Sequence, residues 1–226
     1  MLSDFQIERY SRQIILPQVG GKGQEKLLRA RVLVHGSGSL QTAALLYLAA
    51  AGVGTIGVIA DASSPVLAAF APDHQDTVSA ALTRLNPDCT VVIRRGTGAA
   101  DGEQVVKEYD LVLSSCDPLH DVCYALRRPF LCARVSATDA WLFLCRGYEP
   151  EHPCLHCLPQ HLFAQETDAL PLAALFFGTL LATETITYLL GSSRPTSKLL
   201  HCRFPALQFS DQVIAKDPQC KLCGRW

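Results

Sequence analysis

The run VLVHGSGSLQTAALLYLAAAGVGTIGVIAD, Val32–Asp61, decides the fold of this chain. It opens with three apolar residues, passes through a loop that holds Gly36 and Gly38, and continues as an Ala/Leu-rich segment with no polar face. Gly52 ends that segment, and a second β-branched run leads to Asp61. The pattern predicts a strand, a glycine loop, a buried helix and a second strand, which is the unit of nucleotide-binding α/β domains.

The glycine loop taken alone has two interpretations. Glycines let the backbone approach a phosphate, the following helix N-terminus offers free N–H groups, and Asp61 can hold ribose hydroxyls. The sixth position of the glycine pattern is Gln41, so close contact between helix and strand is less assured. The loop therefore leaves open a nucleotide site, with Gly36, Gly38 and Asp61 as binding residues, and a plain βαβ unit without a ligand.

Length and composition restrict the class of protein. With 226 residues, 49% of them hydrophobic and 18% charged, the chain can form one large α/β domain with a sizeable core. Its net charge of −1 gives no electrostatic reason to expect nucleic acid or an acidic membrane as a partner. The apolar stretch Leu170–Leu190 contains Glu184 and several threonines, so we expect a buried helix and no membrane span.

Ten cysteines behind a polar N-terminus indicate a reducing, cytoplasmic location.

Apolar runs alternate with helical segments along the chain, and this order predicts a Rossmann-like α/β fold with a doubly wound, mostly parallel sheet. We expect strands near 31–35, 55–60, 90–94 and 110–114, and helices near 40–51, 75–85 and 118–127. Strand-like segments at 141–145 and 198–204 predict a mixed or antiparallel C-terminal extension. One domain, 1–226, then comprises a helical arm (1–30), a nucleotide-binding-type half (31–135) and a C-terminal half (136–226).

Two Cys-x-x-Cys pairs give the strongest spacing signal in the chain. They are Cys154 with Cys157 and Cys220 with Cys223. Each pair can present two thiolates to one ion, and four thiolates make a closed tetrahedral zinc site. Such a site has no open position for water, so the zinc ion would be structural and would clip the C-terminus to the middle of the fold. Unliganded thiols or two disulfides are the alternatives.

Several motifs together resemble the ThiF/MoeB/HesA family, the bacterial relatives of ubiquitin-activating enzymes. They run in the family's order: RYSRQI from Arg9, QEKLL from Gln24, VLVHGSGSL from Val32, LAAAGVG from Leu48, LTRLNP from Leu82, DLVL from Asp110, and both Cys-x-x-Cys pairs. The resemblance covers nearly the whole chain. It implies ATP- and Mg²⁺-dependent adenylation of the C-terminal glycine of a ubiquitin-like or sulfur-carrier protein, in a homodimer or heterodimer.

The resemblance also assigns roles to individual residues. Asp61 matches the ribose-binding acid, and Asp117 matches the Mg²⁺-associated aspartate, although the surrounding run is changed to Ser-Ser-Cys-Asp-Pro. Arg12 matches an arginine that reaches into the neighbouring subunit's ATP site. The implied catalytic residues are thus Arg12 and Asp117, and the implied nucleotide-binding residues are Gly36, Gly38, Asp61 and Asp117.

The departures from the family fall mainly on the phosphate-binding segment. After Asp61 the family carries an Asn, an Arg and a Lys that contact the ATP phosphates, but residues 62–83 contain none of the three, and His74 stands near the Lys position. Members that form a thioester or persulfide usually use a cysteine between the positions of Cys157 and Cys202, and this chain has none there. These losses predict a degenerate member.

Three functions follow for testing. The first is a non-catalytic or partner subunit that binds a ubiquitin-like or sulfur-carrier protein and donates Arg12 in trans. The alternative is an active adenylyltransferase whose phosphate site is rebuilt from other residues. The third, a nicotinamide- or flavin-dependent enzyme, is compatible with the glycine loop and Asp61 but leaves the cysteine pairs and the Arg9–Gln13 motif unexplained.

Overall fold

A single eight-stranded sheet forms the framework of the protein. The computed structural model describes residues 1–36, 38–59, 78–94, 99–115, 118–159, 162, 171–192 and 197–224. The strands lie in the order β3-β2-β1-β4-β5-β6-β7-β8. Their bounds are Arg31–His35 (β1), Thr55–Ile59 (β2), Thr90–Arg94 (β3), Leu111–Ser114 (β4), Phe130–Val135 (β5), Asp139–Cys145 (β6), Lys198–Arg203 (β7) and Gln208–Val213 (β8). β3 to β5 pair in parallel, whereas β5 to β8 pair antiparallel.

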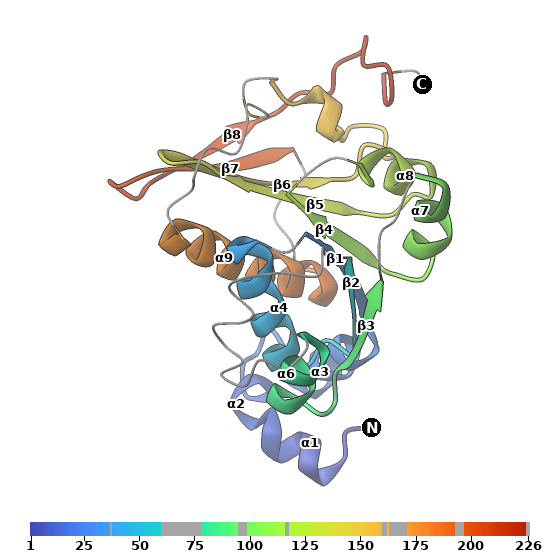
Figure 1. The fold of residues 1–226 in the computed structure, drawn as a ribbon, viewed down its shortest axis with the longest axis vertical. Helices are drawn as coiled ribbons and strands as arrows, with labels where there is room; N and C mark the ends of the chain where they lie inside the picture. The colour runs from blue at the N-terminus through green and yellow to red at the C-terminus, as the bar shows by residue number, and fades with distance from the viewer. Residues whose placement is uncertain are drawn as a thin grey trace.

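Helices cover both faces of the sheet (Figure 1). Their bounds are Asp4–Arg9 (α1), Ser11–Ile14 (α2), Gly20–Arg29 (α3), Ser39–Ala51 (α4), Val78–Leu85 (α6), Ala99–Val106 (α7), His120–Ala125 (α8) and Pro171–Leu190 (α9), with a 3₁₀ turn, η1, at Leu155–Cys157. Alternating residues of β1 point to opposite faces: Val32 and Val34 pack in one buried cluster with α4 and α9, and Leu33 packs in another with α7 and α8. The sheet therefore has two hydrophobic cores.

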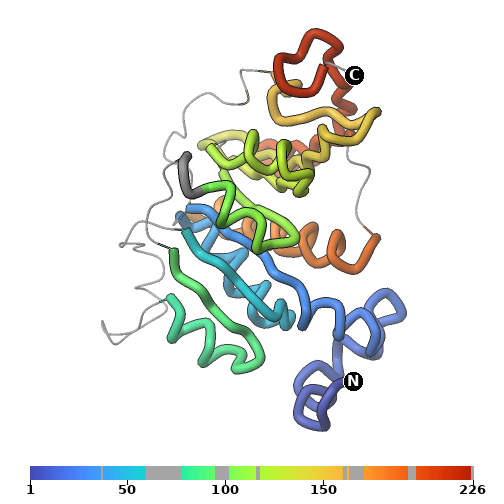
Figure 2. Tube along the Cα trace, turned by 90° about the vertical axis from the view of Figure 1, so that its right-hand side faces the viewer, coloured from blue at the N-terminus to red at the C-terminus, as the bar shows by residue number. Residues whose placement is uncertain are grey.

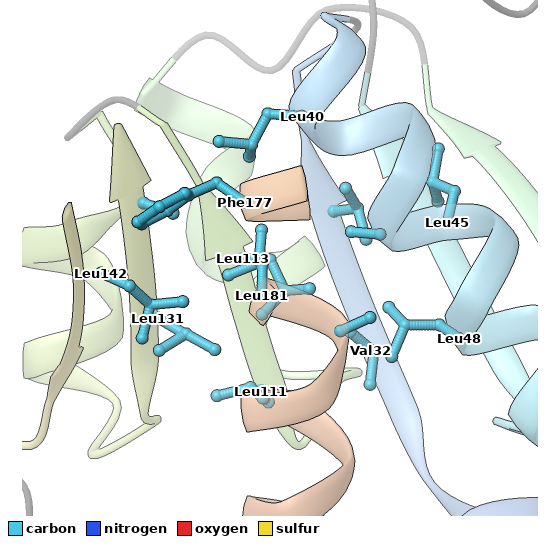
Figure 3. Packing of buried hydrophobic residues seen from close by; sticks show 14 of the residues in the cluster. Val32, Leu40, Leu45, Leu48, Leu111, Leu113, Leu131, Leu142, Phe177 and Leu181 are labelled. Carbon is cyan, nitrogen blue, oxygen red and sulfur yellow. The ribbon is translucent and has the colours of Figure 1, made fainter. Parts of the chain in front are cut away.

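The close approach of α9 to α4 organises the larger core (Figure 3). Gly178 makes this approach possible, because a Cβ at that position would lie 2.2 Å from the Leu40 carbonyl oxygen. Phe177 and Leu181 on α9 are fully buried beside Gly178 and point toward the strands. By length and composition α9 could cross a membrane, yet one side of it is buried against α4 and the sheet, as expected for a core helix.

The N-terminal arm, α1 to α3, is fixed to the body through buried polar contacts. The Tyr10 hydroxyl donates to Asp88 Oδ2 at 3.0 Å and accepts from Asn86 Nδ2 at 2.9 Å. Asn86 Nδ2 also donates to the Ala49 carbonyl near the C-terminal end of α4. Burial raises the pKa of Tyr10 to about 12, so the phenol stays protonated and donates. Arg9 adds an ion pair with Asp88 at 3.3 Å.

The predicted fold class is confirmed, including the antiparallel extension. Three elements were missed: α7, β5 and β8. Each has a weak local signal, because α7 contains Gly102, β5 is interrupted by Arg134, and β8 is polar and exposed along its length. Their positions depend on pairing and packing with neighbouring elements.

We predict that Gly178→Ala lowers the free energy of unfolding by about 3 kcal/mol, because the new methyl group meets a backbone carbonyl that cannot move without shifting α4. Urea unfolding followed by circular dichroism measures the change. Gly21→Ala is the matched control: it also lies in a helix, has no heavy atom near its would-be Cβ, and is expected to be neutral or slightly stabilising. Equal effects of the two substitutions would contradict the packing argument.

Candidate functional site

The topological switch point lies between β1 and β4. The helix after β1, α4, packs on one face of the sheet, and the helix after β4, α8, packs on the other. In open α/β sheets, ligands bind outside the carboxyl ends of the strands at such a point. Here the strand ends are joined by a hydrogen bond of 3.0 Å between His35 Nδ1 and Ser114 Oγ. The first turn of α4 follows Gly36 and Gly38, and the backbone of Gly36 has a φ of 117°.

Only part of the expected nucleotide site can be placed. Gly36 and Gly38 lie at the carboxyl end of β1, as the glycine pattern predicts. Asp61 and Asp117, with His74, lie outside the described residues, so their roles stay predictions. The glycine loop packs against the side chain of Gln41, a residue that is only 3% exposed to solvent.

Arg12 lies far from the glycine loop of its own chain. It sits on α2, in the arm that Tyr10 joins to Asn86, which in turn donates to the Ala49 carbonyl near the C-terminal end of α4, whereas the glycine loop lies at the opposite end of α4. At about 1.5 Å per helical residue, Ala49 and Gly38 are separated by roughly 16 Å along α4. Arg12 is exposed, and within the described part of the chain it makes no ion pair. Its guanidinium is therefore available to another molecule.

The four cysteines of the two Cys-x-x-Cys pairs come together at the end of the molecule opposite the arm (Figure 2). The Sγ atoms are separated by 3.9 Å for Cys154–Cys157, 3.6 Å for Cys154–Cys220 and 3.4 Å for Cys157–Cys223. Zinc–sulfur bonds of about 2.3 Å in a tetrahedron place sulfurs about 3.8 Å apart, whereas a disulfide requires about 2.05 Å. The spacing fits a closed tetrathiolate zinc site and not two disulfides.

Backbone and lysine contacts shape the turns that carry these thiols. The Cys157 N–H donates to the Cys154 carbonyl, and the Gly224 N–H donates to the Cys220 carbonyl, which closes a tight turn around each pair. The Lys216 ammonium donates to the Pro150 carbonyl at 2.9 Å and thereby holds the C-terminal segment beside the first pair. The hydrogen bond from Cys154 lowers the pKa of the Cys157 thiol and raises that of Cys154.

A second cluster, His120, Asp121 and His156, adjoins the four cysteines. His120 is 2% exposed, and its Nε2 accepts a hydrogen bond of 3.1 Å from the Leu155 N–H, inside the turn between Cys154 and Cys157. Its Nδ1 lies 3.0 Å from Asp121 Oδ1, which also lies 2.9 Å from His156 Nε2. With Nε2 accepting, His120 is a neutral imidazole whose Nδ1–H donates to Asp121. Both its nitrogens make hydrogen bonds, so His120 joins α8 to the turn between Cys154 and Cys157.

The role of His120 was missed by sequence reasoning. Only the adjacent His-Asp pair at the start of α8 could have indicated it, and that pair has no characteristic spacing from the cysteines. The contact with Leu155 joins residues far apart in the chain, and it exists only because α8 and η1 pack on the same face of the sheet.

Comparisons with known proteins identify the family of this chain. Residues 10–62 and 73–222 match the ThiF family, and the chain belongs to that family. It is 31% identical to the molybdopterin-synthase adenylyltransferase of Escherichia coli, with 99% of each chain covered. It is 29% identical to the sulfur carrier protein adenylyltransferase of Thermus thermophilus, with 97% of this chain and 91% of that protein covered.

Solved structures with the same fold include Escherichia coli MccB, with a TM-score of 0.78 and 19% identity over 96% of this chain and 72% of that one. PaaA gives a TM-score of 0.77 and 14% identity over 95% of this chain and 84% of its own. At these identities the likeness concerns the fold. One MccB structure contains AMPCPP and the peptide MccA.

We predict that the purified, reduced protein binds one zinc ion per chain, measured by elemental analysis. Cys220→Ser removes one of four thiolates and is expected to abolish stoichiometric zinc and to lower the melting temperature by several degrees. Cys89→Ser is the matched control, since Cys89 is a buried thiol outside the cluster. Zinc retained at full stoichiometry in the Cys220 variant would contradict the assignment.

We also predict that His120→Ala weakens zinc binding about tenfold or more, because the turn between the first two thiols loses its buried hydrogen-bond acceptor. Competition with a chromogenic chelator measures the affinity. His201→Ala provides the control: that imidazole also pairs with a carboxylate, Asp139, at 2.8 Å, but lies on β7 away from the cysteines. An unchanged zinc affinity for His120→Ala would show that the turn holds its shape without the histidine.

Proposed function

We propose that this chain is a ThiF-family subunit without adenylation activity of its own, which binds a ubiquitin-like or sulfur-carrier protein and donates Arg12 to the active site of a partner subunit. The observation that carries the proposal is the position of Arg12. It is exposed and unpaired among the described residues, and it sits on an arm that Tyr10 fixes to the body at the far end of α4. An arginine held in this way can stabilise phosphate charge in a neighbouring molecule.

The composition after Asp61 supports the loss of catalysis in cis. Residues 62–83 contain no Lys, Arg or Asn, and residues 63–72 fall outside the two stretches that match the family. Each charge-assisted contact with the transition state of a phosphoryl or adenylyl transfer is worth about 3 kcal/mol. Without such contacts the chain would bind Mg-ATP weakly, and a partner that keeps them would carry the reaction.

Apolar side chains around Arg12 support a subunit interface at the arm. Phe5 is 82% exposed and Ile15 is 76% exposed, while Ile7 and Leu16 are also largely in contact with solvent. Clustered exposed apolar residues mark interaction surfaces, and their presence next to an unpaired arginine suits a contact that buries the arm. The partner would be a second copy or an active family member in the cytoplasm, and the zinc ion would be structural.

The alternative is an active adenylyltransferase that uses ATP and Mg²⁺. The full-length identity with the Escherichia coli molybdopterin-synthase adenylyltransferase favours it. Under this alternative Asp61 and Asp117 bind ribose and Mg²⁺, and other cations replace the missing phosphate contacts. The two functions differ in one measurable property, which is the binding of Mg-ATP by the isolated chain.

We predict that this chain restores ATP–pyrophosphate exchange to an active family member whose own arm arginine has been changed to alanine. In the mixed complex, Arg12→Ala is expected to lower the exchange rate about 100-fold, because one transition-state contact is lost. Arg29→Ala is the matched control, an exposed arm arginine that pairs within its own helix with Glu25.

Two results would contradict the proposal. One is an unchanged exchange rate with Arg12→Ala in every mixed complex. The other is micromolar binding of Mg-ATP to the isolated, zinc-replete chain by calorimetry, which would favour the active enzyme. No binding at millimolar Mg-ATP is the expected result for the isolated wild-type chain.

A further inference from the structure

The side chain of Gln41 spans the switch point of the sheet. Gln41 is in the first turn of α4, on one face, and its Nε2 donates a hydrogen bond of 2.9 Å to Ser115 Oγ, directly after β4. The chain continues from Ser115 toward α8, on the other face. The amide therefore connects the two halves of the sheet at the place where open α/β sheets bind their ligands.

The two loop glycines make room for this amide. A Cβ at Gly36 would lie 2.8 Å from Gln41 Nε2 and 2.9 Å from Gln41 Cδ, and a Cβ at Gly38 would lie 3.2 Å from Gln41 Oε1. Both glycines thus present bare backbone to a side chain of the same protein. In a nucleotide-binding loop, the same absence of side chains lets the backbone approach a phosphate.

Burial and hydrogen bonding hold Gln41 in this position. The side chain is 3% exposed, so its amide is shielded from water on nearly all sides. Removing a buried amide from its partner leaves unsatisfied polar atoms on both sides, which opposes its displacement. A second hydrogen bond, between His35 and Ser114, joins the last residues of β1 and β4, which are paired in the sheet.

We infer that Gln41 is an internal plug that occupies the phosphate position of the glycine loop and excludes nucleotides from it. The inference rests on the proposed function, which it deepens by naming a second cause for the loss of ATP binding, independent of the missing cations after Asp61. On this inference the positions of Gly36 and Gly38 must be glycine because a side chain there would collide with the Gln41 amide. The retention of the glycine pattern therefore does not indicate a nucleotide ligand.

Calorimetric titration of the zinc-replete protein with Mg-ATP, and separately with AMP, tests the inference. Gln41→Ala empties the space beside Gly36 and Gly38. We expect this variant to bind Mg-ATP or AMP at least tenfold more tightly than the wild type does. Gln41→Met keeps the volume without the hydrogen bond to Ser115 and is expected to bind as the wild type does. Gln24→Ala is the second control, because Gln24 is also fully buried, donates to the Ala51 carbonyl and fills the space beside Gly52.

The outcomes separate this inference from the proposed function. Unchanged or weaker binding of both nucleotides by Gln41→Ala overturns the plug, and weaker binding would make Gln41 a ligand contact. Equal gains in the Ala and Met variants overturn it as well, since the volume would not matter. Micromolar Mg-ATP binding by the wild type overturns both the plug and the proposed function, whereas an unchanged exchange rate with Arg12→Ala in the mixed complexes overturns the proposed function alone. If Gln41→Ala loses its zinc or its circular dichroism, Gln41→Ser carries the test: it also empties the space beside Gly36 and Gly38 and is expected to raise affinity in the same direction.

Discussion

The parallel pairing of β1 with both β2 and β4 is the constraint on which the rest of this structure depends. β1 is buried on both faces, so its neighbours and covering helices must be apolar where they meet it. The chain changes faces between the helix that follows β1 and the helix that follows β4, and this change brings the first turn of α4 next to the end of β4.

α4 separates the two functional regions of the molecule. Its N-terminal turn carries Gln41 and meets the glycine loop, while its C-terminal end receives the arm through Asn86 and the Ala49 carbonyl. Gly178 lets α9 pack directly against the backbone of α4. The arm and the glycine loop therefore lie near opposite ends of α4, which are separated by roughly 16 Å at about 1.5 Å per residue. The proposed use of Arg12 in trans follows from this geometry.

Buried polar groups define the contacts between distant parts of the chain. Tyr10 anchors the arm, Gln41 joins the first turn of α4 to the residue after β4, and His120 holds the turn that carries Cys154 and Cys157. Each is nearly fully buried and each has a hydrogen-bond partner far away in sequence. An unpaired buried polar group costs about 1–3 kcal/mol, so these pairs select one arrangement of the arm, the loop and the metal site over others of similar compactness.

The sequence by itself determined the parallel core, the buried character of α4 and α9, and the two pairs of thiols, because apolar periodicity, glycine punctuation and Cys-x-x-Cys spacing are local signals. It indicated Gln41 only as a departure from a glycine pattern. The tertiary structure decided that the Gln41 amide lies against Gly36 and Gly38, that the arm carrying Arg12 is fixed near the end of α4 opposite the glycine loop, and that His120 supports the cysteine turn. It also placed β5 and β8, whose sequences are too polar or too interrupted to indicate strands without their neighbours. These features depend on residues distant in the chain that meet only after the sheet has formed, and no pattern of adjacent residues records such a meeting.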